Sequence, residues 1–219
     1  MNIFKKISNR LSDIIFPRRC VGCQEYGIVL CEQCLATLPS AVLTKQSFVT
    51  ALFDYHNPIV KKAIWKFKYG NVRGLAKNFS EKLYDEIIGD LSDRLYITKN
   101  QTFLMLPIPL HPQRNRERGY NQSELIVQEL IKRDSNHLFQ FSPTALLRIH
   151  KTKPQAKSDK RRARLENLQG AFKANQKIVN GKDIIIIDDV VTTGATISEA
   201  RKALLASGAR SVRAYVIAH

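Results

Sequence analysis

The chain has 219 residues, enough for one sizeable α/β domain with a small extra module but short for two full catalytic domains. Its composition, 44% hydrophobic and 25% charged, excludes a disordered chain, and no apolar run approaches the roughly 20 residues that a membrane span needs. Thirty-five Lys and Arg against 19 Asp and Glu give a formal charge of +16, so we expect a polyanionic partner.

Residues 1–16 are predicted to form an amphipathic helix. Apolar side chains recur at helical spacing from Ile3 to Ile15, with basic residues between them. We expect this helix to dock on the protein's own core, and contact with an anionic membrane surface is the alternative. No continuous apolar stretch or cleavage site follows, so the predicted location is cytoplasmic, with a peripheral membrane contact left open.

All four cysteines lie in the next segment, residues 17–40, as two C-x-x-C pairs separated by seven residues. Two such turns can complete the tetrahedral thiolate shell that Zn²⁺ prefers, at about 2.3 Å per bond. The segment is therefore predicted to be a closed, structural zinc knuckle with the ligands Cys20, Cys23, Cys31 and Cys34. Gly22 would allow the tight turn inside the first pair. Two disulfides are disfavoured by a reducing cytosol, and a redox C-x-x-C site is disfavoured by the paired clustering.

A boundary is expected near residues 38–47, and residues 47–219 have the pattern of one α/β domain. Short apolar or β-branched runs predict strands at 48–55, 103–106, 184–187 and 212–217. Apolar residues at helical spacing predict helices at 60–67, 75–87, 123–132 and 198–206. A loop is expected between the strand at 103–106 and the helix at 123–132. The alternation of strand, loop and helix favours a parallel sheet.

The most informative segment is Ile184–Thr196, in which four isoleucines precede Asp188-Asp189-Val-Val-Thr-Thr-Gly-Ala-Thr. Four consecutive isoleucines need burial on both sheet faces, which predicts a central parallel strand, and ligands bind beyond the carboxyl ends of such strands. The small-residue turn Thr192–Thr196 then opens a helix, where backbone N–H groups, hydroxyls and the helix dipole can hold one phosphate. The two carboxylates would repel that phosphate unless they served sugar hydroxyls or Mg²⁺, so we predict a sugar phosphate ligand.

The segment also has features of two other kinds of site. A hydrophobic strand ending in two acids is also a feature of nucleotide hydrolases, in the Walker B element. However, no G-x-x-x-x-G-K-[ST] stretch occurs in the sequence, and its glycines form no dinucleotide fingerprint. The remaining alternative is that Asp188 and Asp189 only cap an ordinary helix.

The strand, the two acids and the Thr-Thr-Gly-Ala-Thr turn closely resemble the 5-phosphoribosyl 1-pyrophosphate (PRPP) motif of the type I phosphoribosyltransferases. Together with the cysteine pairs, Pro107–Pro112, Arg116–Ser123 and the terminal strand, they resemble the ComF family over nearly the whole chain. The resemblance implies an α/β, type I phosphoribosyltransferase-like fold with a central parallel sheet and a small N-terminal four-cysteine zinc knuckle. It also implies structural Zn²⁺, and Mg²⁺ bound with PRPP.

The resemblance further implies roles for individual residues. Asp188 and Asp189 would hold the ribose hydroxyls. The 5′-phosphate would be surrounded by Val191, Thr192, Thr193, Gly194, Ala195 and Thr196. The pyrophosphate, with its Mg²⁺, would face the loop residues Arg118, Gly119, Tyr120 and Asn121. On a chain this basic, a solvated surface position is the alternative for any single arginine.

Two basic segments predict contact with single-stranded DNA. Between Arg148 and Arg164, eight Lys or Arg residues stand against one acid, Asp159, and this tract could close over PRPP or follow a nucleic-acid backbone. Four lysines between positions 61 and 68 surround Trp65, on which a base could stack. For Trp65, however, a position in the core is favoured.

We therefore predict a PRPP-binding ComF-type protein that acts in DNA uptake during natural transformation and in single-stranded DNA handling, with other DNA-uptake proteins as further partners. The alternative is an active phosphoribosyltransferase that transfers the phosphoribosyl group to an acceptor, and release of pyrophosphate separates the two. A zinc-stabilised interaction protein with a vestigial site is disfavoured because both acids and the complete loop are present.

Overall fold

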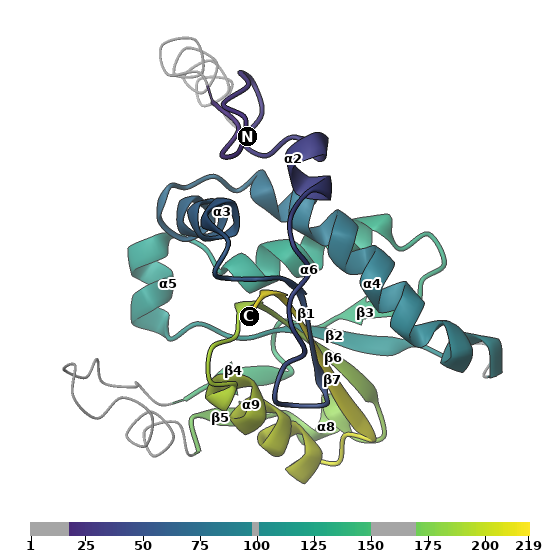
Figure 1. Ribbon diagram of the computed structural model, residues 1–219. Helices are drawn as coiled ribbons and strands as arrows, with labels where there is room; N and C mark the ends of the chain where they lie inside the picture. The colour runs from purple at the N-terminus through teal and green to yellow at the C-terminus, as the bar shows by residue number, and fades with distance from the viewer. Residues whose placement is uncertain (1–17, 98–100, 150–169) are drawn as a thin grey trace, which may run out of the picture.

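The computed structural model describes residues 18–97, 101–149 and 170–219 (Figure 1). The helix expected at 1–16 and the basic tract between Arg148 and Arg164, apart from its first two residues, lie outside these residues. Within them, no helix is long and apolar enough to cross a membrane.

Five strands form one parallel sheet in the order β1–β7–β6–β2–β3 (Figure 1). They are β1 (Val49–Phe53), β2 (Phe103–Pro107), β3 (Phe139–Phe141), β6 (Asp183–Val190) and β7 (Ser211–Ala218). The isoleucine strand β6 is central, because Ile186 pairs with Leu106 of β2 on one side and with Ala214 of β7 on the other. The prediction of a central parallel strand is confirmed.

Helices cover both faces of this sheet, and successive residues of β6 face them alternately. Ile185 and Ile187 belong to a hydrophobic cluster with residues of α3 (Pro58–Tyr69), α4 (Leu75–Ile97) and α6 (Gln122–Arg133). Ile184 and Ile186 belong to a second cluster on the other face. That cluster contains residues of α8 (Gln176–Val179), α9 (Ala195–Ala206) and the antiparallel pair β4 (Leu146–Arg148) and β5 (Phe172–Ala174).

The connections that follow β2 and β6 lead to opposite edges of the sheet. From β2 the chain passes through α5 (Pro112–Arg118) and α6 to β3, and from β6 it passes through α9 to β7. Diverging connections leave a crevice at the carboxyl ends of the two strands, which is where open α/β sheets bind ligands. The segment singled out in the sequence, at the end of β6, therefore lies at the β2–β6 switch point.

The expectation of a plain loop after β2 is wrong, because that segment contains helix α5. Pro112 occupies its first turn, and the ring of His111 caps it by accepting a hydrogen bond from the backbone N–H of Gln113 at 3.2 Å. None of its seven residues is buried. The helix therefore has no apolar stripe from which the sequence could predict it.

The N-terminal cysteine segment, which includes the short helix α2 (Glu32–Ala36), packs on the α/β body. Val21, Leu30 and Leu35 are buried in the same cluster as residues of α3 and α4. The side chain of Asn78, on α4, donates a hydrogen bond to the carbonyl of Leu30 at 3.1 Å. The segment thus shares a hydrophobic core with the larger body.

Candidate functional site

Asp188 and Asp189 lie near the end of β6, and both make contacts with residues far away in the sequence. Asp188 Oδ1 accepts hydrogen bonds from the hydroxyl of Ser123, at the start of α6, and from the backbone N–H of Asp189, both at 2.9 Å. Asp189 Oδ1 lies 2.8 Å from Nζ of Lys68, on α3. The fold therefore supplies each acid with a polar partner that local sequence patterns do not reveal.

Asp188 has an unusually high pKa for an aspartate. Burial raises its pKa to about 7, helped by the charge of Asp189, whereas the Asp189 N–H, Lys68 and Ser123 oppose the rise. Near neutral pH, the Asp188 carboxyl is thus divided between its protonated and ionised forms. Donor hydroxyls or a divalent cation would favour the ionised form, because both stabilise a carboxylate.

The turn between β6 and α9 starts a helix whose N-cap residue is a glycine. Gly194, the N-cap residue of α9, has a φ of 76° in the left-handed region, where only glycine is comfortable. It has no side chain to satisfy the first N–H groups of the helix. The N–H of Ala195 donates a long hydrogen bond, 3.4 Å, to the hydroxyl of Thr193, two residues earlier. The N–H groups of the first helical turn and the positive end of the helix dipole together favour a phosphate here.

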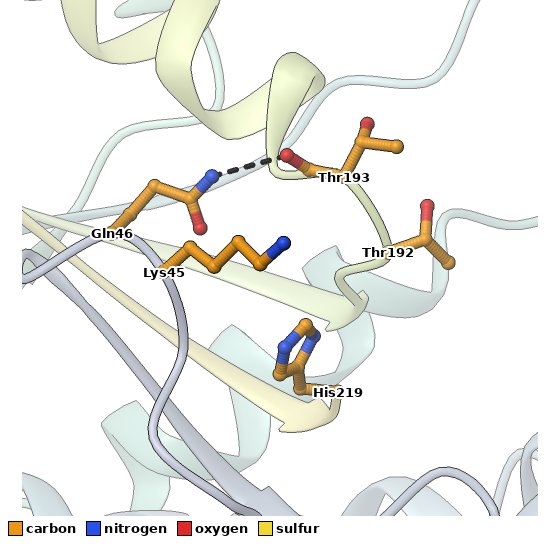
Figure 2. A pocket seen from close by; sticks show the side chains of 5 residues that line it. All are labelled: Lys45, Gln46, Thr192, Thr193 and His219. Atoms are coloured by element: carbon orange, nitrogen blue, oxygen red, sulfur yellow. Dashed lines mark hydrogen bonds between the residues drawn. The ribbon is translucent and has the colours of Figure 1, made fainter. Parts of the chain in front are cut away.

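A pocket of about 180 Å³ lies beside this turn, lined by Lys45, Gln46, Thr192, Thr193 and His219 (Figure 2). Gln46 Nε2 donates a hydrogen bond to the carbonyl of Thr193 at 3.0 Å, and a side chain at Gly194 would collide with Gln46. Figure 2 shows the amine of Lys45 directed into the pocket. Lys45 and Gln46 were not predicted to belong to the site, because they precede β1 in a segment without an apolar pattern or motif.

The residues expected to face pyrophosphate, Arg118 to Asn121, join α5 to α6. Gly119 ends α5 in the left-handed region, with a φ of 74°. Tyr120 is buried, and its hydroxyl donates a hydrogen bond to the carbonyl of Phe67. Asn121 caps α6 by accepting from the N–H of Ser123 at 3.1 Å, and its Nδ2 donates to the carbonyl of Ile108 at 3.0 Å. These contacts fix the start of α6, from which Ser123 reaches Asp188.

Comparison with known proteins assigns the chain to a family. A family model described as a phosphoribosyl transferase domain matches residues 122–219. The competence protein ComFC of Bacillus subtilis is 30% identical over 188 residues, which cover 85% of this chain and 70% of that protein. The DNA utilization protein YhgH of Escherichia coli is 32% identical over 193 residues, which cover 85% of this chain and 76% of that protein. The chain belongs to the ComF family.

The ComF chain thus combines the parallel five-stranded sheet with a matched phosphoribosyl transferase domain, and its fold is of the type I phosphoribosyltransferase class. Among solved structures, a hypoxanthine phosphoribosyltransferase from Staphylococcus aureus is similar with a TM-score of 0.39 and 15% identity. The similar part covers 64% of this chain and 62% of that one.

One side chain of the ComF chain lies elsewhere than predicted. Trp65 is 59% exposed, so the favoured prediction of a core position is wrong. The buried stripe of α3 runs through Ile64 and Phe67, and Trp65 points away from it because neighbouring helix positions are about 100° apart. Lys68, expected on the same basic face, instead pairs with Asp189.

The four cysteines of the ComF chain come together as a single cluster. Their sulfur atoms all lie within 4.8 Å of one another, and Cys31 Sγ lies 3.7 Å from the sulfurs of both Cys20 and Cys23. Four bonds of 2.3 Å in a tetrahedron separate sulfurs by about 3.8 Å, whereas a disulfide needs about 2.05 Å. All four cysteines are free. The cluster is therefore compatible with a structural metal ion.

Local contacts shift the pKa values of two cysteines of the cluster in opposite directions. The neighbouring Cys31 and then burial raise the pKa of Cys34 to about 12. For Cys20, burial also acts to raise the pKa, but backbone hydrogen bonds outweigh it and lower the value to about 6. One thiolate thus forms readily and the last does not, unless a cation offsets the charge. Gly22 is required for close approach, since a Cβ there would lie 2.6 Å from Cys34 Sγ.

Proposed function

We propose that this ComF chain binds PRPP at the β2–β6 switch point and acts in the uptake and handling of single-stranded DNA. One observation carries the PRPP part: Asp188 and Asp189 lie at the same sheet edge as the open turn Thr192–Thr196. A pair of carboxylates suits the two adjacent hydroxyls of a ribose, and the turn suits its 5′-phosphate. A phosphorylated pentose presents both groups.

In this proposal, each neighbouring residue has a defined task. Ser123 and Lys68 hold the two carboxylates in place for the ribose hydroxyls. Val191 to Thr196 surround the 5′-phosphate, and Lys45 adds a positive charge beside the turn. The segment Arg118 to Asn121, which joins α5 to α6, would face the pyrophosphate. Mg²⁺, bound with PRPP, would offset the pyrophosphate charge, and the carboxylates of Asp188 and Asp189 are the hard oxygen donors that this ion prefers.

Calorimetry with PRPP and Mg²⁺ tests the site. Replacing both acids, Asp188→Asn with Asp189→Asn, should weaken PRPP binding by about 2–4 kcal/mol, because charge-assisted hydrogen bonds to the ribose are lost. Thr193→Val is the matched control in the same site, and it should weaken binding less because backbone amides make most contacts with a phosphate in such a turn. Unchanged affinity in the double variant would show that the ribose lies elsewhere.

The match to a phosphoribosyl transferase domain favours a second candidate, an active phosphoribosyltransferase. In that reaction the bond from C1′ to pyrophosphate breaks as the bond from C1′ to the acceptor nucleophile forms. Negative charge grows on the departing pyrophosphate, where Arg118 and Mg²⁺ would stabilise it. A screen for pyrophosphate release over candidate acceptors tests this, and PRPP binding without release for any acceptor would favour a regulatory role for PRPP.

Two observations support the proposed DNA function. The relatives at about 30% identity carry the names competence protein and DNA utilization protein. The formal charge of +16 gives the ComF chain the electrostatic character of a protein that binds a nucleic-acid backbone. We propose Zn²⁺ as the ion of the cysteine cluster, and other proteins of DNA uptake as partners.

A further inference from the structure

An exposed aromatic surface lies along α3 beside the end of α5, and we name it the α3–α5 face. Trp65 and Tyr69, one helical turn apart on α3, are 59% and 61% exposed, with ring centroids 6.0 Å apart. The guanidinium of Arg118, the last residue of α5, lies 5.1 Å from the centroid of the Tyr69 ring. It also donates a hydrogen bond to the Tyr69 hydroxyl at 3.3 Å.

The two helices that carry this face are strongly basic. Helix α3 has four lysines and no acid, and α5 has three arginines and one acid, Glu117. The carboxylate of Glu117 already accepts a hydrogen bond from the side chain of Gln113 at 2.9 Å. An apolar protein partner would have to desolvate these cations, which is costly. A polyanion with flat aromatic groups satisfies the cations and the rings together.

The geometry of the face is fixed by contacts with the interior. Arg118 donates to the side chain of Gln122 at 3.1 Å, so the cation over Tyr69 is held from α6. Tyr120 ties the α5–α6 junction to the carbonyl of Phe67, on α3. Because Trp65 and Tyr69 are tilted by 48° to one another, each presents its own ring surface. The Tyr69 ring, held by Arg118, loses little freedom when a base stacks on it.

We propose that the α3–α5 face is a stacking site for the unpaired bases of single-stranded DNA. Trp65 and Tyr69 each take one base. The neighbouring phosphates contact the exposed cations of the two helices, Lys61, Lys62, Arg114 and Arg116. Helix α3 also carries Lys68, the partner of Asp189, so this helix connects the stacking site to the proposed PRPP site. This inference rests on the proposed DNA function and adds the place and the mode of binding.

The test uses Trp65 itself, which is the only tryptophan of the chain, so that its fluorescence reports on the site without a label. The full chain is titrated with an oligodeoxythymidylate of about 20 nucleotides and with an abasic oligomer of the same length. Stacking quenches tryptophan emission, so the thymidylate should quench Trp65. The abasic oligomer should bind through charge alone and leave the emission nearly unchanged.

Variants then measure what each ring contributes, with affinity followed by the anisotropy of a labelled oligomer. Trp65→Ala and Tyr69→Ala should each weaken binding roughly five- to a hundredfold, the usual range for loss of one stacking ring, and Tyr69→Phe should bind like the parent. Tyr26→Ala is the matched control, because Tyr26 is 58% exposed and lies 4.2 Å from the guanidinium of Arg19, in the cysteine segment. Its affinity should not change, and Trp65→Ala should keep its affinity for PRPP.

The outcomes separate this inference from the proposed function. If the thymidylate binds without quenching and Trp65→Ala binds it like the parent, the stacking site is wrong while the DNA function stands. If Tyr26→Ala alone loses affinity, stacking belongs to the cysteine segment. If neither oligomer binds at low salt, the DNA function fails as well. Emission that responds to anionic vesicles but not to thymidylate would assign the face to a membrane surface and overturn the inference.

Discussion

At the scale of single residues, β6 carries Asp183 at its start and Asp188 near its end, and these two acids have opposite consequences for stability. The Asp188 carboxyl has a pKa raised to about 7 by burial and by Asp189, against about 3.9 in an unfolded chain. Between these values the folded chain keeps a proton that the unfolded chain has released. Stability therefore falls as the pH rises from about 4 to about 7.

Replacement of Asp188 by Asn should relieve this cost. The amide oxygen can still accept from Ser123 and from the Asp189 N–H, but the buried charge is gone. We expect Asp188→Asn to raise the free energy of unfolding at pH 8 by on the order of 1–2 kcal/mol, with the gain vanishing near pH 4. Urea unfolding at both pH values measures this change in free energy. A variant less stable than the parent at pH 8 would contradict the claim that the buried charge of Asp188 destabilises the fold.

Asp183, at the other end of β6, stabilises the fold. Burial acts to raise the pKa of this carboxyl, but hydrogen bonds from Arg210, Ser211 and Gln101 outweigh it, so the pKa is lowered. Its stabilisation is therefore complete above the unfolded value near 3.9 and is lost as the pH falls below it. We expect Asp183→Asn to cost about 2–3 kcal/mol at pH 7, with a smaller difference at pH 3. A cost that does not shrink in acid would exclude this cause.

At the scale of elements, the cysteine segment and the α/β body share a hydrophobic cluster. The four candidate metal ligands, however, all lie in the cysteine segment. We expect one Zn²⁺ per chain by elemental analysis of protein purified under reducing conditions, and its complete absence would end the claim. Removal of the ion by a chelator should loosen residues 18–39, because the four sulfurs lose the bonds to the metal that hold them together. Hydrogen exchange should show that change, while the amides of β6 stay protected.

The segment that joins the cysteine segment to β1 reaches the phosphate turn through Gln46. We expect Gln46→Ala to weaken PRPP binding about three- to tenfold, since one hydrogen bond that positions Thr193 and Gly194 is lost. Leu43→Ala is the matched control in the same segment, because Leu43 is almost fully exposed. Calorimetry measures the PRPP affinity of both variants. Equal affinities for Gln46→Ala and Leu43→Ala would show that the Gln46 hydrogen bond does not contribute to binding.

The elements that the sequence predicts are those with a local signal. The burial of four isoleucines and the glycine turn at Gly194 are encoded in adjacent residues, so β6 and the start of α9 could be placed. Ser123, Lys68 and Gln46 reach the site only through the tertiary fold, and no adjacent pattern marks them. Helix α5 buries none of its residues, and Trp65 lies one position away from the apolar stripe of α3. No hydrophobic periodicity therefore marks α5 as a helix or Trp65 as an exposed residue.

At the scale of the whole molecule, the charge of +16 predicts a salt-dependent contact with DNA. Each phosphate contact adds about −0.7 to the slope of log K against log salt for single strands, so four or five contacts give a slope near −3. Affinity should depend little on base sequence.

The basic tract between Arg148 and Arg164 can be tested by replacing Lys157, Lys160, Arg161 and Arg162 with Ser. This variant should have a flatter salt slope if the tract follows the DNA backbone. A variant that binds DNA like the parent but loses PRPP affinity would identify the tract as a substrate lid.

The position of β7 between β6 and β1 constrains how the chain can fold during its synthesis. Val49 of β1 pairs with Ala214 of β7, so the first strand of the sheet stays unpaired until β7 has been made. Until residues 211–218 leave the ribosome, the four isoleucines of β6 also have an unpaired edge, and such edges promote aggregation. The sheet is therefore completed only once β7 has been made, and until then the nascent chain exposes an edge to which another chain can pair.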